Sequence, residues 1–294
     1  MKKSMKFLAL VLAVMLFVCL AACGNTANPE PAESTDPAAS AEPTQDAAAT
    51  AKFRILDGSL AEEEYGIGFR KGDELCDIVN AALKVLAADG TLAKISTEWF
   101  GEDITTIEAD AAALDGMEVE ARDFILGLDD SFPPMGYRDA NNEVVGFDID
   151  LAKAVCEKLG WNLIIQPIDW DAKEMELNAG NIDCIWNGFT LTEERMETMS
   201  CSAPYMKNEQ VVVVMADSEY QSMDDLAGKT LALQTGSSAE EALDAAESFK
   251  ASLGNVNTFT DNMTCFMELE QGSSDAVLVD SIVAGWYIQT GNVA

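Results

Sequence analysis

From Phe53 onward the sequence alternates short strand-like runs with amphipathic helical stretches, and this alternation limits the possible folds more than any other feature. Clear runs are FILGL (124–128), VVVVMA (211–216) and DAVLVD (275–280). Strands that alternate with helices predict parallel sheets covered by helices. We therefore expect an α/β fold, and residues 52–294 suffice for one large domain or two lobes of ordinary size.

Two helices are expected soon after the first strand. Leu75, Ile78, Val79, Ala82, Leu83 and Leu86 fall on one face of a helix. Asp73 can cap this helix, and Asp89-Gly90 ends it. Thr91 can cap the next helix, which ends at Gly101. Residues 102–123 then form a polar joiner with little periodic pattern.

Residues 1–22 have the layout of a secretory signal peptide, with lysines, an apolar run and small residues before Cys23. The apolar run is too short for a comfortable membrane span. LAAC (20–23) resembles the lipobox of bacterial lipoproteins, which predicts lipidation of Cys23; an ordinary signal peptide with an incidental cysteine is the alternative. Residues 23–51 are mostly Ala, Pro, Glu, Ser, Thr and Asp, so we expect a flexible stalk.

The chain is strongly acidic and has no histidine. It carries 18 Lys and Arg against 51 Asp and Glu, a formal net charge of −33 at pH 7. This charge argues against nucleic acid as a partner and leaves the lipid as the link to a membrane. The missing histidine removes Ser-His and Cys-His nucleophiles and histidine-based metal sites. We expect no metal and no other cofactor.

The cysteines after Cys23 have no short repeated spacing. They are Cys76, Cys156, Cys184, Cys201 and Cys265. Most stand within apolar patterns, which favours buried free thiols. A bridge between Cys184 and Cys201 stays open, because sequence does not fix disulfide pairing.

NGFTLTEER (187–195) follows a strand-like run, at the end where open parallel sheets bind ligands. The planar guanidinium of Arg195 suits a carboxylate, and the N–H and hydroxyl of Thr190 could complete the contact. The alternative is a surface arginine paired with Glu193 or Glu194.

Other candidates follow later strands or stand in loops. LQTGSSAEE (233–241) predicts a strand, a glycine turn and a helix start whose free N–H groups can receive an anion. Asp280 could accept an ammonium group, or cap the helix that follows it. Phe132 and Trp170 could hold a ligand side chain between their rings, although a packing role suits Trp170 equally.

Several stretches together carry a family resemblance: DDSFPPMGY, VVGFDIDLAKAV, NIDCIWNGFTLTEER, SAPYM, LAGKTLALQTGSSAEEAL and DAVLVD. They resemble the polar amino-acid-binding proteins of bacterial ABC transporters, solute-binding protein family 3. The resemblance implies a two-lobed, periplasmic-binding-protein-like (type II) α/β fold. Each lobe would be a mostly parallel sheet flanked by helices, and the lobes would close on an amino acid.

The family's segments occur here in an unusual order. EEYGIGFRKGD and DGTLAKISTEWFG resemble the family's last third, yet they stand within residues 53–101, ahead of its first strand at Phe124. The resemblance thus implies a circular permutant in which residues 102–123 join the family's usual termini. Two truncated copies in tandem are the alternative, but neither YGIGF nor FDIDLAKAV occurs twice. Reordering mainly changes loop entropy, about 0.6 kcal/mol per doubling of loop length.

The resemblance also implies the boundaries of the lobes. Lobe one holds residues 64–208, including the joiner. Lobe two combines residues 53–59 with 211–294. The hinges lie near residues 60–63 and 202–210.

Carried over residue by residue, the resemblance assigns the α-carboxylate of the ligand to Arg195 and Thr190, helped by backbone N–H groups near Ser237 and Ser238. It assigns the α-ammonium to Asp280.

The resemblance adds the carbonyl of Gly188 to the ammonium site. Phe132 and Trp170 should flank the ligand side chain, and Asp129 should face its polar end. The remaining expected site residues are Asn187, Phe189 and Gln234. They depart from the types we associate with the family, so the identity of the amino acid stays open.

The sequence therefore predicts a lipid-anchored, monomeric receptor on the outer face of the cell membrane. It would bind a free amino acid, with a polar or cationic side chain, and deliver it to the permease subunits of an ABC transporter. It would perform no covalent chemistry. The alternatives are a ligand-sensing domain for a signalling partner and a dehydratase-like enzyme on the same fold.

Overall fold

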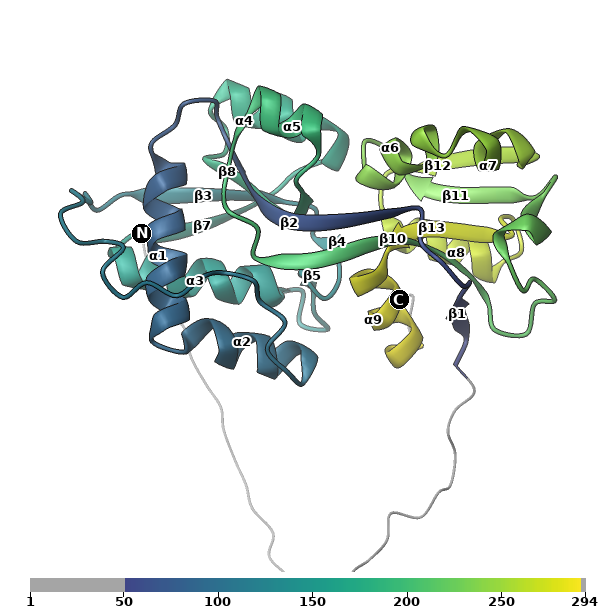
Figure 1. Cartoon of the computed structure of the whole chain (residues 1–294), viewed down its shortest axis with the longest axis horizontal. Helices are drawn as coiled ribbons and strands as arrows, with labels where there is room; N and C mark the ends of the chain where they lie inside the picture. Colours follow the sequence, from purple (N-terminus) through teal and green to yellow (C-terminus); the bar gives the residue numbers. More distant parts are fainter. Residues whose placement is uncertain (1–50, 292–294) are drawn as a thin grey trace, which may run out of the picture. The chain divides into compact units, whose positions relative to one another are not determined.

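The computed structural model describes residues 51–291 (Figure 1), so the predicted signal peptide, Cys23 and the stalk up to residue 50 lie outside the described residues. Among the described residues, one sheet runs in the order β12-β11-β13-β10-β2-β8-β3-β7. Its strands are β2 (Ala61–Phe69), β3 (Asp123–Leu128), β7 (Asn162–Pro167), β8 (Cys184–Thr190), β10 (Met206–Met215), β11 (Thr230–Gln234), β12 (Asn255–Phe259) and β13 (Ala276–Asp280).

Two long strands, β2 and β10, connect the two lobes (Figure 1). Residues 61–65 of β2 pair antiparallel with residues 206–210 of β10. The far end of β2 pairs with β8 in lobe one, and the far end of β10 pairs with β13 in lobe two. The predicted two-lobed α/β fold is confirmed, with one difference. The two sheets expected for the lobes form one hydrogen-bonded sheet, because β2 and β10 pair where they cross.

Lobe one contains the parallel strands β8, β3 and β7, to which β2 adds antiparallel. Helices cover both faces of this sheet, α3 packing on β7 and β8 and α4 on β3 and β8. The helices are α1 (Leu75–Ala88), α2 (Thr91–Phe100), α3 (Phe147–Leu159), the 3-10 turn η1 (Trp170–Ala172), α4 (Lys173–Ala179) and α5 (Glu193–Thr198). The short strands are β4 (Ser131–Phe132), β5 (Gly136–Arg138), β6 (Val144–Val145) and β9 (Ser200–Cys201).

Lobe two contains the parallel strands β12, β11 and β13. Strand β10 pairs antiparallel with β13, and β1 (Phe53–Ile55) pairs antiparallel with β10. Its helices are the 3-10 turn η2 (Met223–Leu226), α6 (Ser238–Ala245), α7 (Glu247–Ser252), α8 (Asn262–Glu270) and α9 (Ser281–Thr290). Helix α9 contacts both β1 and β10. Lys52, just before β1, forms an ion pair with Glu270 at the end of α8. The first and last described elements therefore lie in one lobe.

The helix starts differ in detail from those predicted. Residue Glu74 precedes α1 as its N-cap, while the Asp73 carboxylate accepts the N–H of Leu75 at 3.1 Å. Helix α2 begins at Thr91 itself, whose N–H and hydroxyl both donate to Asp89. Gly90 is therefore the N-cap of the helix that Thr91 was expected to cap, and Asp89 bonds the N–H two residues ahead, as aspartates in turns do.

The largest hydrophobic cluster draws on both lobes and on segments far apart in the chain. It includes Phe53 of β1, Leu83 of α1, Phe124 of β3 and Phe266 of α8. The described cysteines are all free thiols, four of them buried, so the bridge between Cys184 and Cys201 is not formed. Among residues 51–291, no helix is long and apolar enough to cross a membrane.

Candidate functional site: a cavity between the lobes

A narrow cavity lies where β8, α5, α6 and β13 meet. Its lining residues come from both lobes: Phe132, Trp170, Asn187, Gly188, Thr190, Arg195, Gln234, Ser237, Ser238 and Asp280. Every predicted ligand-binding residue lines the cavity except Asp129 and Phe189. The parallel strands β8, β11 and β13 all end here, as expected for ligand sites in such sheets.

Arg195 supplies a buried cation on the lobe-one side. It lies in α5, whose cap Thr192 accepts the Arg195 N–H through its hydroxyl. The guanidinium donates to the Thr190 carbonyl at 2.9 Å and to the Gly236 carbonyl of lobe two at 3.5 Å. It also lies 4.7 Å from the centre of the Phe189 ring. Phe189 thus packs under the guanidinium and in the core instead of lining the cavity.

Lys173 is a second buried cation near the same point, and the sequence analysis did not select it. Its ammonium donates to the Gly236 carbonyl at 2.9 Å and to the Trp170 carbonyl at 3.3 Å. Burial, with repulsion from Arg195, lowers the pKa of Lys173 to about 8. Ser237 is the N-cap of α6, and Ser238 is its first residue. Two cations beside a helix N-terminus favour an anionic group such as a carboxylate.

Asp280 supplies the opposite charge from the end of β13. Its Oδ1 accepts the Tyr65 hydroxyl and the Asn208 amide, both at 2.6 Å. Burial, followed by repulsion from Glu63, raises the pKa of Asp280 well above its usual range. A cationic group placed against this carboxylate would favour its ionised form.

Gly188 shapes the wall between these charges. Its φ is 52°, and a Cβ there would come within 2.7 Å of the Phe132 ring. Only glycine adopts this conformation at low cost, and its small size lets the ring approach. The Gly188 N–H donates to the buried Asp148 carboxylate of α3 at 2.6 Å.

At the far end of the cavity the lobes meet through amide side chains. Gln234 of lobe two donates to the Asp129 carboxylate of lobe one at 2.8 Å and accepts the Asn262 amide at 3.0 Å. The Asn187 oxygen accepts the Asp129 N–H at 3.1 Å, while the Asn187 Nδ2 has no partner among the described residues. Asp129 was expected to face the ligand directly. It is instead bonded to Gln234, which lines the cavity in front of it.

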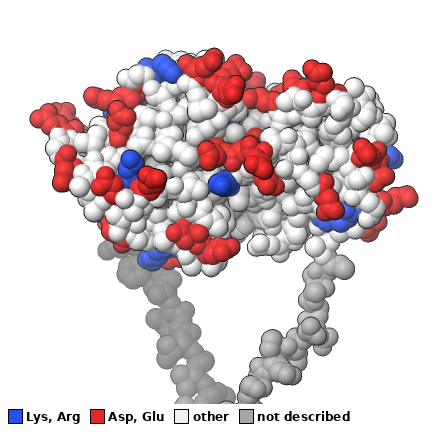
Figure 2. Space-filling model, viewed as in Figure 1, with Lys and Arg blue, Asp and Glu red and all other residues white. Residues whose placement is uncertain are grey.

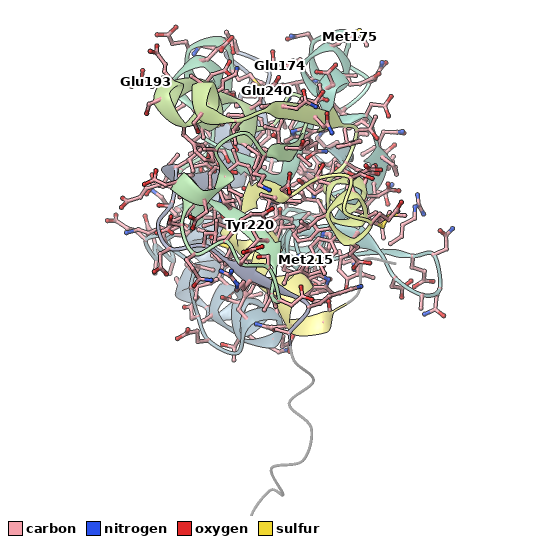
Figure 3. All side chains as sticks on the ribbon, turned by 90° about the vertical axis from the view of Figure 1, so that its right-hand side faces the viewer. Glu174, Met175, Glu193, Met215, Tyr220 and Glu240 are labelled. Carbon is pink, nitrogen blue, oxygen red and sulfur yellow. The ribbon has the colours of Figure 1, made fainter. Side chains whose placement is uncertain are left out.

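Acidic side chains surround the buried cations. Glu241 lies 3.6 Å from the Arg195 guanidinium. Figure 3 shows Glu174, Glu193 and Glu240 near one edge, where Figure 1 places α4, α5 and α6. Acidic residues also outnumber basic ones on the face drawn in Figure 2. This field favours a zwitterionic or cationic solute over an anionic one.

The sequence analysis missed Glu63, Tyr65, Lys173, Asn208 and Gln210, all of which contact cavity-lining residues. Four of them lie on β2 or β10, outside the loops that follow parallel strands. Their approach to the site depends on strand pairing, and no local motif marks it. Among the described residues, no group of three or more acidic or cysteine side chains could hold a metal.

Comparisons with known proteins point in one direction. Residues 124–283 match the family of bacterial extracellular solute-binding proteins, family 3. The chain is 31% identical to the arginine-binding extracellular protein ArtP of Bacillus subtilis over 60% of this chain and 68% of that protein. It is 28% identical to the L-cystine-binding protein TcyJ of Escherichia coli over 54% of this chain and 59% of that protein.

Solved structures agree. An ABC uptake transporter substrate-binding protein from Streptococcus pneumoniae with bound histidine is 40% identical and superimposes with a TM-score of 0.56, over 57% of this chain and 70% of that one. An ancestral arginine-binding protein bound to arginine is 36% identical, with a TM-score of 0.53 over 58% and 76%. Both likenesses cover little more than half of this chain.

Proposed function

This chain belongs to the bacterial extracellular solute-binding proteins, family 3, and from that premise we propose that its cavity binds an α-amino acid. The α-carboxylate lies against Arg195, Thr190 and the N–H groups near Ser237 and Ser238. The α-ammonium lies against Asp280 and the carbonyl of Gly188. The observation that carries this proposal is that Arg195 and Asp280, of opposite charge and from different lobes, line the same cavity.

The side chain of the amino acid lies between Phe132 and Trp170 and ends near Asn187 and Gln234. A polar or cationic side chain fits best, because amides line this end, Asp129 lies behind them and the surroundings are acidic. Relatives named for arginine and cystine, and a structure with bound histidine, support this class of ligand.

Binding is coupled to closure of the lobes. A ligand shifts a conformational equilibrium only by its difference in affinity for the two states. An amino acid that touches Arg195 and Asp280 at once bonds fully only to the closed form. The protein then delivers the amino acid to the permease subunits of an ABC transporter.

The domain plan is that of a circular permutant, with lobe one in residues 64–208, lobe two in 53–59 plus 211–294, and residues 102–123 as the joiner. The hinges lie near residues 60–63 and 202–210. Two observations support it. Residues 53–101 lie outside the matched family segment, yet β1 and β2 pair with strands of that segment. Helix α9 also contacts β1.

Residues 1–22 direct export, and a lipid on Cys23 anchors the mature chain to the outer face of the membrane. The support is the LAAC tetrad and the extracellular family. Replacing Cys23 by Ala should release the receptor into the medium of the expressing cells. Equal retention of both forms in the membrane fraction would refute the anchor.

A thermal-shift screen of the common L-amino acids tests the function, since a ligand of the folded state raises the melting temperature. Calorimetry should then show that Arg195→Ala and Asp280→Asn each lower affinity more than about a hundredfold. Each leaves one buried charge of the ligand unpaired, a cost of about 3 to 5 kcal/mol. Arg138→Ala, a partly exposed arginine, is the control. Affinity within tenfold of wild type in Arg195→Ala would contradict the assignment.

A further inference from the structure

Part of the cavity wall also borders a larger groove on its other side, away from the amino acid. Thr190 and Ser238 line the cavity and also a larger groove that follows the hinge strands β2 and β10. Figure 2 shows acidic side chains gathered where, in Figure 1, these strands pass from one lobe to the other. The groove is lined by Ala61, Glu62, Glu63, Glu64, Thr190, Leu191, Thr192, Lys207, Asn208, Glu209, Ser238, Glu241, Ala242 and Ser281.

Glu63, an acidic residue of this groove, is hydrogen-bonded to the cavity wall. Its Oε2 accepts the Asn208 amide at 2.9 Å and the Thr190 hydroxyl and Gln210 amide at 3.0 Å. The Ser238 hydroxyl lies 3.4 Å from the same oxygen. One carboxylate on a hinge strand thus contacts lobe one through Thr190 and lobe two through Ser238.

Strand register explains this convergence. Glu63 is paired with Asn208, Tyr65 with Thr190, and Gln210 with Asp280. Directly opposite residues of an antiparallel pair share a face, and so do residues two apart on one strand. Glu63 therefore shares a face with the Asp280 site, whereas Glu62 and Glu64 point to the other face and are exposed.

The contacts of Glu63 fix the direction of hydrogen bonds around the ammonium site. An ionised carboxylate only accepts, so the Thr190 hydroxyl gives Glu63 its one hydrogen and accepts from the Ser238 hydroxyl at 3.0 Å. Asn208 donates one amide hydrogen to Glu63 and the other to Asp280. Glu63 thus holds Asn208, the donor that orients Asp280.

Glu63 also adds a charge at this end. The groups that face Asp280 are Tyr65 and Glu63 on β2, Asn208 and Gln210 on β10, and the charge of Arg195 across the cavity. Glu63 is the one acid among them, and its repulsion, after burial, raises the pKa of Asp280. An ammonium group between the lobes would be attracted by both carboxylates.

Resting on the proposed function, we propose that Glu63 is a positioning residue that makes this end of the cavity an ammonium site and sets how its affinity for amino acids depends on pH. It acts through Thr190, Asn208 and Asp280 and from outside the cavity lining. Nothing in the local sequence around Glu63 marks it for this role.

The test uses the full chain with Glu63→Gln, and with Glu62→Gln and Glu64→Gln as matched controls that remove the same charge from exposed neighbours. The twenty common L-amino acids are screened against wild type. The tightest one whose side chain does not titrate between about pH 5 and pH 8 is then used for calorimetry across that range.

Glu63→Gln should lower affinity about tenfold or more at pH 8, with a smaller loss at pH 5, and should move the midpoint of the pH dependence to lower pH. The controls should match wild type. An effect no larger than that of the controls would overturn the proposal. So would an equal loss at every pH with an unmoved midpoint, because that marks a merely structural role.

Two further measurements keep the test decisive. Glu63→Asp keeps the charge, so it should keep the wild-type midpoint even if affinity falls; a shifted midpoint would refute the charge effect. A ¹³C NMR titration of Asp280, without any amino acid, should give a lower pKa in Glu63→Gln than in wild type. If wild type binds none of the amino acids, the proposed function fails too. If wild type binds one of them and Glu63→Gln behaves like the controls, only this inference fails.

Discussion

The buried carboxylate of Asp148 lowers the stability of the fold when ionised, but it fixes the backbone of the site. It lies fully buried in the first turn of α3, where its Oδ2 holds the Gly188 N–H and its Oδ1 has no hydrogen-bond partner among the described residues. Burial raises the pKa of Asp148 to about 7. The ionised carboxylate is therefore costly in the folded protein, yet it anchors the strand that carries Gly188 and Thr190.

We predict that Asp148→Asn removes a pH dependence of stability. The folded pKa of Asp148 lies above the unfolded one, so its stabilising contribution is fully present below about pH 4 and is lost as pH rises through about 7. Asparagine keeps an acceptor for Gly188 but cannot ionise. Urea unfolding should show the variant gaining on wild type by up to a few kcal/mol between pH 5 and pH 8. A constant difference between the two pH values would contradict the assigned pKa.

The residues most open to sequence reasoning were those at strand ends or shortly after them. Arg195 lies in α5, shortly after β8, and Asp280 is the last residue of β13. Both could be named from their motifs, and both line the cavity. Asp129 does not line the cavity, because the Gln234 amide of the other lobe covers it. Tyr65 and Asn208 reach Asp280 only through pairing between strands far apart in the chain, which no local pattern encodes.

Among the elements, α3 depends on a glycine at its start. Gly146 is the N-cap of α3 with a φ of 147°, and a Cβ there would come within 2.2 Å of the Met135 carbonyl oxygen. The close approach lets the Phe147 and Asp148 N–H groups donate to the Pro134 and Met135 carbonyls. No local pattern in the sequence reveals that the first turn of this helix rests on a loop.

Two glycine substitutions should have opposite effects. Gly146→Ala should destabilise the fold by about 2 kcal/mol or more, since both its φ and the Met135 carbonyl oppose a side chain. Gly285→Ala is the control in α9, where a Cβ meets nothing within 4 Å; it should stabilise by about 0.5 to 1 kcal/mol. Urea midpoints measure both. Equal stability of Gly146→Ala and wild type would show that the loop moves freely.

For the whole molecule, contacts matter more than chain order. The first described strand, β1, pairs with β10, and the strand β2 bridges both lobes although it precedes the matched family segment. The alternation of strands and helices in the sequence predicted the α/β class, and the family resemblance implied the two lobes. It could not predict that both lobes share one sheet, because that depends on hydrogen bonds between β2 and β10 at the hinge.

A reordered chain tests the proposed permutation. It would start near residue 117, run to residue 291, continue through a short linker to residue 52 and end at residue 116. It should bind the same amino acids as the natural order and unfold within about 1 to 2 kcal/mol of it, because the change affects mainly loop entropy. A chain that fails to fold, or that folds and loses amino-acid binding, would refute the proposed domain plan.

The central claim is that one amino acid joins the two lobes through charges of opposite sign. A crystal structure of the full chain with the amino acid that gives the largest thermal shift tests it most directly. We predict the α-carboxylate within hydrogen-bonding distance of the Arg195 guanidinium and the α-ammonium within that distance of Asp280. An amino acid found elsewhere, or bound to one of these residues without the other, would contradict the account.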